Sequence, residues 1–132
     1  MTFRKANIED IKAIRNSFCC PKRPDNLDNF FDKFDGFVAI EDDKIVAFLY
    51  GIDLVDPLAR KKRFYITEIL VRDNYRYEGI ENSLIECLLN YLVENDFNEL
   101  LYFSSSQYTR NICKRIRGSS ENETTQIKWF IQ

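Results

Sequence analysis

The sequence predicts an α/β fold in which a mixed β-sheet is flanked by helices. Segments rich in β-branched and aromatic residues take turns with segments whose apolar residues recur every three or four positions. Turn-forming residues separate these segments, and the resulting order is β-α-α-β-β-β-α-β-α-β. We expect residues 1–132 to form a single domain, because this length supports one hydrophobic core and is too short for two.

The N-terminal part is predicted to contain one strand and two helices. Thr2–Ala6 is the strand, and Asn7 is the expected N-cap of the first helix, with Asp10 at the third helical position. The stretch Cys20–Pro24 contains two prolines and ends this helix. Asn26–Phe34 is predicted as a second, short helix because its Leu and Phe residues recur at helical spacing.

Three strands follow in the middle of the chain. Gly36–Glu41 and Lys44–Asp53 flank Asp42-Asp43, which predicts a β-hairpin with a two-residue turn. A polar loop is expected over residues 56–62. Arg63–Val71 then contains enough β-formers for a long strand.

The last part of the chain alternates helices and strands. Glu81–Glu94 is predicted as a helix with one apolar face, and Glu99–Phe103 as the next strand. Gln107–Arg117 is predicted as a basic helix that ends at Gly118. The final strand is expected at Thr125–Ile131, because alternation there indicates one buried face.

Composition excludes several kinds of chemistry. The chain has no histidine, so Ser-His-Asp catalysis, Cys-His catalysis and histidine-ligated zinc are ruled out, and no metal site is expected. A net charge of −2 argues against a general nucleic-acid-binding protein. The four cysteines form no C-x-x-C pair, and for adjacent Cys19 and Cys20 we favour reduced thiols over a soft-metal site or a vicinal disulfide.

The sequence also predicts a location. No signal peptide is recognisable at the N-terminus. No apolar run approaches the roughly eighteen residues that a membrane span needs. We therefore expect a cytoplasmic protein without a membrane partner.

The stretch Val71–Ile80 is the most informative segment. It joins a predicted strand to a predicted helix through a tight polar turn, which directs several backbone N–H groups at one point. The positive end of the helix dipole lies behind these groups. Gly79 has no Cβ, so an anion can approach the backbone there. The segment therefore predicts a phosphate-binding site.

This loop and the order of elements around it resemble the GNAT superfamily of N-acetyltransferases, over essentially the whole chain. The resemblance is carried by residues 68–81. In that family an Arg/Gln-x-x-Gly-x-Gly/Ala loop binds the pyrophosphate of acetyl-CoA through backbone amides. Arg76 and Gly79 match the first two fixed positions, and Glu81 occupies the third.

Glu81 leaves two alternatives open. A carboxylate that faces the pyrophosphate would repel it, so that this copy of the fold has lost binding of coenzyme A (CoA). A carboxylate that faces solvent would only favour the helix N-terminus, by about 0.3–1 kcal/mol. We favour the second alternative, because the main-chain amides of the loop provide most of the binding.

The resemblance implies an acyl-CoA N-acyltransferase-like fold. In this fold the strand before the loop splays from the next parallel strand, and the pantetheine arm of the cofactor lies in the gap. The implied cofactor-binding residues are Ile69, Leu70, Val71, Arg76, Tyr77, Glu78, Gly79, Ile80 and Glu81.

Two catalytic residues are proposed on the same basis. Glu68 is the candidate base, because family members often carry a carboxylate on this strand; the alternative is a solvated or salt-bridged Glu. The tyrosine that many members place in the last helix is absent at its usual position. Tyr108 is the candidate proton donor and Cys113 a second one, with core packing or solvent exposure as the alternative for each.

The implied function is transfer of an acetyl group from acetyl-CoA to a primary amine of a small molecule or a protein. The alternative is a catalytically degraded module that binds CoA or a partner without turnover. A weaker alternative is nucleic-acid binding through the basic helix. The basic residues at 61–63 and on that helix are candidates for a phosphate contact, with solvated faces as the default. The acceptor is not readable, and a homodimer through the strand with Trp129 is a candidate assembly.

Overall fold

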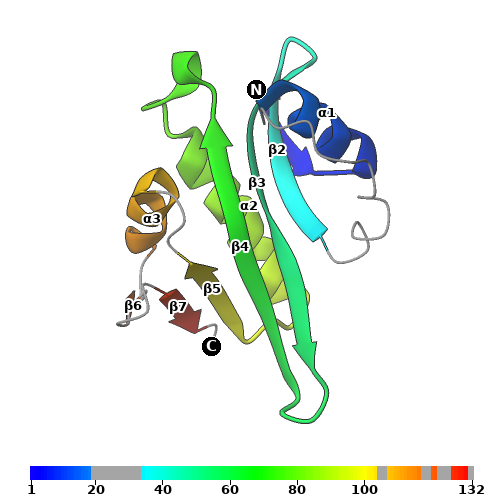
Figure 1. Cartoon of the computed structure of the whole chain (residues 1–132), viewed down its shortest axis with the longest axis vertical. Helices are drawn as coiled ribbons and strands as arrows, with labels where there is room; N and C mark the ends of the chain where they lie inside the picture. Colours follow the sequence, from blue (N-terminus) through cyan, green and yellow to red (C-terminus); the bar gives the residue numbers. More distant parts are fainter. Residues whose placement is uncertain (19–33, 104–106, 117–119, 122–125, 131–132) are drawn as a thin grey trace.

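A computed structural model describes residues 1–18, 34–103, 107–116, 120–121 and 126–130 (Figure 1). The elements are β1 (Thr2–Lys5), α1 (Ile8–Phe18), β2 (Phe34–Glu41), β3 (Lys44–Asp56), β4 (Lys61–Val71), a short 3₁₀ helix (Asp73–Tyr75), α2 (Ile80–Glu94), β5 (Glu99–Phe103), α3 (Gln107–Lys114), β6 (Ser120–Glu121) and β7 (Gln126–Phe130).

The described strands form one mixed sheet in the order β1-β2-β3-β4-β5-β7-β6. Strands β1 to β4 follow one another as antiparallel neighbours. The pairing of β4 with β5 is parallel, and α2 is the crossover that joins these two strands. The α/β fold with a mixed sheet flanked by helices is thereby confirmed, with an element order close to the predicted one.

Helix α1 begins as its sequence predicts. The Asn7 side-chain oxygen accepts a hydrogen bond from the Asp10 N–H at 2.9 Å, and the Asp10 carboxylate accepts one from the Asn7 N–H at 2.8 Å. This reciprocal pair satisfies two backbone donors that the helix leaves open. The Arg4 guanidinium binds both Asp10 oxygens, at 2.6 and 2.9 Å, and lowers the pKa of this buried carboxyl.

The hairpin between β2 and β3 also follows the prediction. Asp42 and Asp43 both have positive φ, 51° and 61°, as a two-residue type I′ turn requires. Glu41 and Lys44 are the last paired residues on either side. The turn matches the twist of the two strands and therefore fixes their register.

Several boundaries differ from the sequence prediction. Phe34 belongs to β2 and not to a helix, while residues 26–33 of the predicted second helix lie outside the described residues. Strands β3 and β4 extend into the expected polar loop from both sides, through Asp56 and from Lys61, and leave a tip at 57–60. Helix α3 ends at Lys114 rather than at Arg117, and Ser120–Glu121 forms a short strand in addition to the predicted elements.

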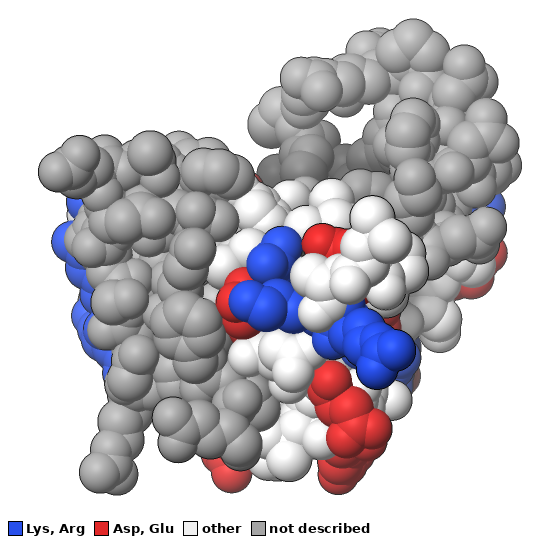
Figure 2. All heavy atoms as spheres, turned by 90° about the horizontal axis from the view of Figure 1, so that it is seen from below, with Lys and Arg blue, Asp and Glu red and all other residues white. Residues whose placement is uncertain are grey.

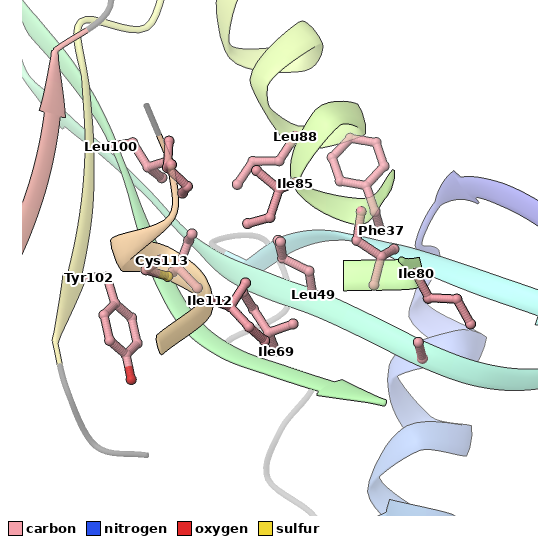
Figure 3. Close-up of a cluster of buried hydrophobic side chains, with 14 of the residues drawn as sticks. Phe37, Leu49, Ile69, Ile80, Ile85, Leu88, Leu100, Tyr102, Ile112 and Cys113 are labelled. Carbon is pink, nitrogen blue, oxygen red and sulfur yellow. The ribbon is translucent and has the colours of Figure 1, made fainter. Parts of the chain in front are cut away.

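The two faces of the sheet carry separate cores. The larger core joins the sheet to α2 and α3, and Figure 3 shows its side chains from these elements pointing at one another. The smaller core lies on the opposite face, where Ile14 of α1 packs with Val38 and Phe48. Neighbouring residues such as Phe37 and Val38 enter different cores, as expected for side chains that alternate across a strand.

A β-bulge interrupts this alternation in β4. Phe64 and Ile66 point into the larger core, and so do Ile69 and Val71, although the spacing between the two pairs is odd. The pairing with β3 shifts at this point, between Tyr50 and Gly51. The extra residue removes Thr67 and Glu68 from the larger core and increases the local twist.

Gly51 lies in this irregularity, and we expect Gly51→Ala to destabilise the fold. An added Cβ would overlap the Tyr65 carbonyl oxygen and the Phe64 ring. Such overpacking typically costs about 1–3 kcal/mol, and backbone contact places this site at the upper end. Urea denaturation measures the loss. Gly79→Ala is the matched control, since its Cβ meets nothing within 4 Å and costs only about 1 kcal/mol through its positive φ. Equal losses at both positions would contradict the close approach at Gly51.

Candidate functional site

Strand β4 extends beyond the end of its pairing with the parallel strand β5. The β4–β5 pairing runs from Arg63 opposite Glu99 to Ile66 opposite Tyr102, and β4 then continues to Val71 without β5 beside it. Helix α3 borders this unpaired edge through Thr109, which is fully buried and contacts β4. The edge therefore has main-chain groups that no strand satisfies.

The direction of these groups follows from the pairing with β3. The Arg72 N–H donates to the Val46 carbonyl at 2.9 Å, so in the alternating antiparallel pattern Leu70 is also bonded to β3. Ile69 and Val71 consequently direct their N–H and C=O groups away from β3, into the gap. Of the three strand residues predicted to bind pantetheine, these two are placed to do so and the main chain of Leu70 is not.

Side chains of the protein already occupy both carbonyls at this edge. The Thr109 hydroxyl lies 3.2 Å from the Ile69 oxygen, and the Arg76 Nε donates to the Val71 oxygen at 3.2 Å. No described residue accepts a hydrogen bond from the Val71 N–H. The gap is thus partly filled, with one donor still open.

The loop between β4 and α2 presents a row of open donors. The chain turns through Asp73–Tyr75 and reaches Gly79, the N-cap of α2, which has φ 80°. Within the part of the chain that the structure describes, no group accepts a hydrogen bond from the backbone N–H groups of 77–82. Nothing lies within 4 Å of the position of a Gly79 Cβ, so this surface of the loop is open. These are the conditions for an anion site at a helix N-terminus.

Three side chains meet beside this site. The Tyr108 hydroxyl, from α3, donates to the Glu81 carboxylate, from the first turn of α2, at 2.6 Å. The Arg76 guanidinium carbon lies 4.7 Å from the centre of the Tyr108 ring, a cation–π geometry. Neither predicted alternative for Glu81 describes this arrangement, because the carboxylate is bound to another helix and does not simply face solvent.

Glu68 lies at the bulge, beside α3. Its carboxylate is 3.2 Å from the Thr109 hydroxyl, which can donate either to it or to the Ile69 carbonyl. Loss of hydration raises the pKa of Glu68, while the Thr109 hydroxyl and the Ile69 N–H lower it in part. A carboxyl with a raised pKa is suited to accept a proton near neutral pH.

The two candidate proton donors have poor surroundings for that role. Burial raises the pKa of Tyr108, and its hydrogen bond to Glu81 and the negative charge there raise it further. Cys113 is buried in the larger core, and burial raises the pKa of its thiol to about 12. A donor role for Tyr108 stays a prediction.

The structure thus brings the predicted site residues together at one end of the gap. Arg76, Gly79 and Glu81 lie in the loop and first turn that carry the open donors, and Glu68 lies further down β4. Thr109, which touches both Glu68 and Ile69, was not identified from the sequence. A threonine within a polar, basic helix carries no local signal, because its contacts are about forty residues away in the chain.

The basic residues at 61–63 lie at the other end of β4. Eight residues separate Arg63 from Val71, or about 26 Å along an extended strand. Lys61 and Arg63 pair with the buried Glu99, and Lys62 donates to the Asn95 carbonyl. Figure 2, which views this end of the molecule, shows basic and acidic side chains side by side on its described surface. These residues therefore lie far along the strand from the open N–H groups near Gly79, and their contact with a phosphate stays a prediction.

The remaining predictions concern metal ions, the membrane, the cysteines and the dimer, and they are compared here with the described residues. No group of three or more His, Cys, Asp or Glu side chains is arranged to hold a metal ion there. None of the helices in those ranges is long and apolar enough to cross a membrane. Cys87 and Cys113 are free thiols, whereas Cys19 and Cys20 lie outside the described part. Trp129 belongs to β7, which pairs with both β5 and β6, and the dimer prediction stays untested.

Comparison with known protein families gives a match. The sequence model of the acetyltransferase (GNAT) family matches residues 7–118. A search of curated proteins gives no significant match.

Solved structures share the fold at low sequence identity. An aminoglycoside acetyltransferase from an uncultured soil metagenomic sample, in complex with trehalose, is 20% identical over 92% of this chain and 90% of its own, with a TM-score of 0.74. A predicted acetyltransferase with acetyl-CoA from Clostridium acetobutylicum is 20% identical over 92% of each chain, with a TM-score of 0.71. Ribosomal-protein-alanine N-acetyltransferase from Brucella melitensis biovar Abortus 2308 is 18% identical over 100% and 99% of the two chains, with a TM-score of 0.73.

The raised pKa of Glu68 predicts how Glu68→Gln changes stability with pH. Folded protein holds this proton more tightly than unfolded protein, so the wild-type free energy of unfolding falls as pH rises from the ordinary value of 4.5 through the raised pKa. Gln keeps the acceptor for Thr109 and does not titrate. We therefore expect the stability of Glu68→Gln relative to wild type to increase from about pH 4 to pH 7, measured by urea denaturation. Glu86→Gln, at an exposed position of α2, is the control, and a pH-independent difference for Glu68→Gln would contradict the assignment.

Proposed function

The chain belongs to the acetyltransferase (GNAT) family, and we propose that it moves an acetyl group from acetyl-CoA to a primary amine of a small molecule or a protein. The observation that carries this proposal is the row of open N–H donors at the start of α2, next to a strand edge that β5 does not cover. An anionic group at the helix N-terminus and an extended chain along β4 fit these two features.

The residues around the gap supply what amine acylation needs. The amine nitrogen attacks the thioester carbonyl carbon, the new C–N bond forms, and the C–S bond breaks to release a thiolate. The proton lost by the amine passes to the Glu68 carboxylate, directly or through a water, and the thiolate takes up a proton from a solvent water. The open Val71 N–H is a candidate donor to the carbonyl oxygen as negative charge develops there.

Some rearrangement has to accompany binding. A pantetheine chain that bonds to the Ile69 and Val71 carbonyls competes with Thr109 and Arg76. Both competitors are single hydrogen bonds of 3.2 Å, each with a modest net contribution of about 0.5–1.5 kcal/mol. The free-energy cost of replacing these two hydrogen bonds by hydrogen bonds to the ligand is therefore small.

The similar structures support the choice of donor and acceptor class. One of them contains acetyl-CoA, and two are named for transfer to aminoglycosides or to a ribosomal-protein alanine. Their low identity leaves the acceptor of this chain open. The absence of a tyrosine at the usual proton-donor position keeps the alternative open, a module that binds CoA or a partner without turnover, and the test below separates the two.

Acetyl-CoA is expected to raise the melting temperature of the protein, because a ligand that binds only the folded state stabilises it. With a panel of primary amines, release of free CoA thiol is expected for at least one acceptor. Glu68→Gln should then lower kcat by roughly 10²-fold or more while the Kd for acetyl-CoA stays within about twofold, since general-base catalysis contributes at that scale. Stabilisation without thiol release would identify the non-catalytic module, and no stabilisation would refute cofactor binding.

Gly79→Asn tests the open loop. Asparagine tolerates a positive φ, so the loop conformation is retained, but its side chain projects into the space where an anion would approach. We expect acetyl-CoA binding by calorimetry to weaken at least about tenfold, or 1.4 kcal/mol, with little change in melting temperature. Glu94→Asn, at the exposed other end of α2, is the control. Unchanged affinity for Gly79→Asn would rule out this loop as the phosphate site.

A further inference from the structure

We propose that Tyr108 is a positioning residue of the anion site, which holds the Glu81 carboxylate away from the open amides at the start of α2. The inference rests on the proposed function, because it assumes that the diphosphate of acetyl-CoA binds at these amides. It assigns Tyr108 a role in cofactor affinity in place of proton donation.

Glu81 is a potential competitor of the ligand. It is the second residue of α2, so its own N–H is one of the open donors. An acidic side chain in the first turn is attracted to the positive helix terminus and to these N–H groups. A carboxylate that settled there would satisfy the donors and repel an incoming phosphate.

The contact with Tyr108 holds the carboxylate in another place. The Tyr108 hydroxyl comes from α3 and binds one carboxylate oxygen at 2.6 Å, a short charge-assisted bond. This bond directs the carboxylate toward α3 while the N–H groups of 77–82 stay open in the described structure. It also bridges α2 and α3 across the end of the gap.

The Tyr108 ring also supports the side chain of Arg76. Its guanidinium stacks on the Tyr108 ring at 4.7 Å, its Nε donates to Val71, and Asp73 lies 3.5 Å away. The two terminal nitrogens of Arg76 have no hydrogen-bond partner among the described residues, so they are available to a phosphate. The ring supports the Arg76 side chain, and the hydroxyl restrains Glu81. Tyr108→Phe removes the hydrogen bond to Glu81 and keeps the ring beneath Arg76.

A double-mutant cycle tests the inference. Wild type, Tyr108→Phe, Glu81→Ala and the double variant are compared by calorimetry with CoA. We expect Tyr108→Phe to weaken CoA binding by about three- to tenfold, because it releases a negative charge near the ligand. In the Glu81→Ala background the same change is expected to have no effect. The defect of Tyr108→Phe should shrink as salt is raised, since it is electrostatic.

Two other outcomes would contradict the inference or the proposed function. If Tyr108→Phe lowers kcat with unchanged CoA affinity, and does so with or without Glu81, then Tyr108 is the proton donor and the inference is wrong. If wild type does not bind CoA at all, the proposed function itself fails. Melting temperatures of the four proteins report folding. Should Tyr108→Phe not fold, Glu81→Gln replaces it: this variant keeps the hydrogen bond, loses the charge and is expected to bind CoA more tightly, and weaker binding would overturn the inference.

Discussion

The separation of β4 from β5 is the constraint on which the rest of the site depends. Parallel pairing ends at Ile66, and the bulge that follows rotates β4 so that Ile69 and Val71 re-enter the larger core. Residues that fill a fully packed core fix the strand in this course, since no other register buries the same side chains. The gap, the unpaired main chain of β4 and the position of Glu68 all follow from that single irregularity.

Electrostatics around the loop between β4 and α2 are arranged unusually for a candidate anion site. Glu78 and Glu81 lie within the loop and first turn, so formal charge does not make this region strongly positive. Affinity for phosphate then has to come from main-chain donors, the helix dipole and Arg76. Under these conditions, the placement of one carboxylate would matter more than the number of basic residues nearby, and this is the basis of the role proposed for Tyr108.

Local patterns in the sequence predicted much of the fold. The Asn7–Asp10 capping pair and the Asp42-Asp43 turn are encoded within a few residues and were found as expected. The bulge also has a signal, because apolar residues at 64, 66, 69 and 71 change parity. Contacts between residues far apart in the chain have no such signal in the sequence. Tyr108 meets Glu81, and Thr109 meets Glu68, only after the sheet and both helices are assembled. Ile69 and Val71 were predicted as gap residues from the family resemblance, but their hydrogen bonds to Thr109 and Arg76 were not predicted.

The occupied carbonyls of β4 have a consequence for the protein without ligand. An unpaired strand edge is a template onto which a strand of another chain can add, and proteins generally protect such edges. Thr109 and Arg76 bind the Ile69 and Val71 oxygens, so two of the acceptors that an intruding strand would use are already taken. These two hydrogen bonds, which a pantetheine arm would displace under the proposed function, therefore also protect this edge against intermolecular β-sheet association.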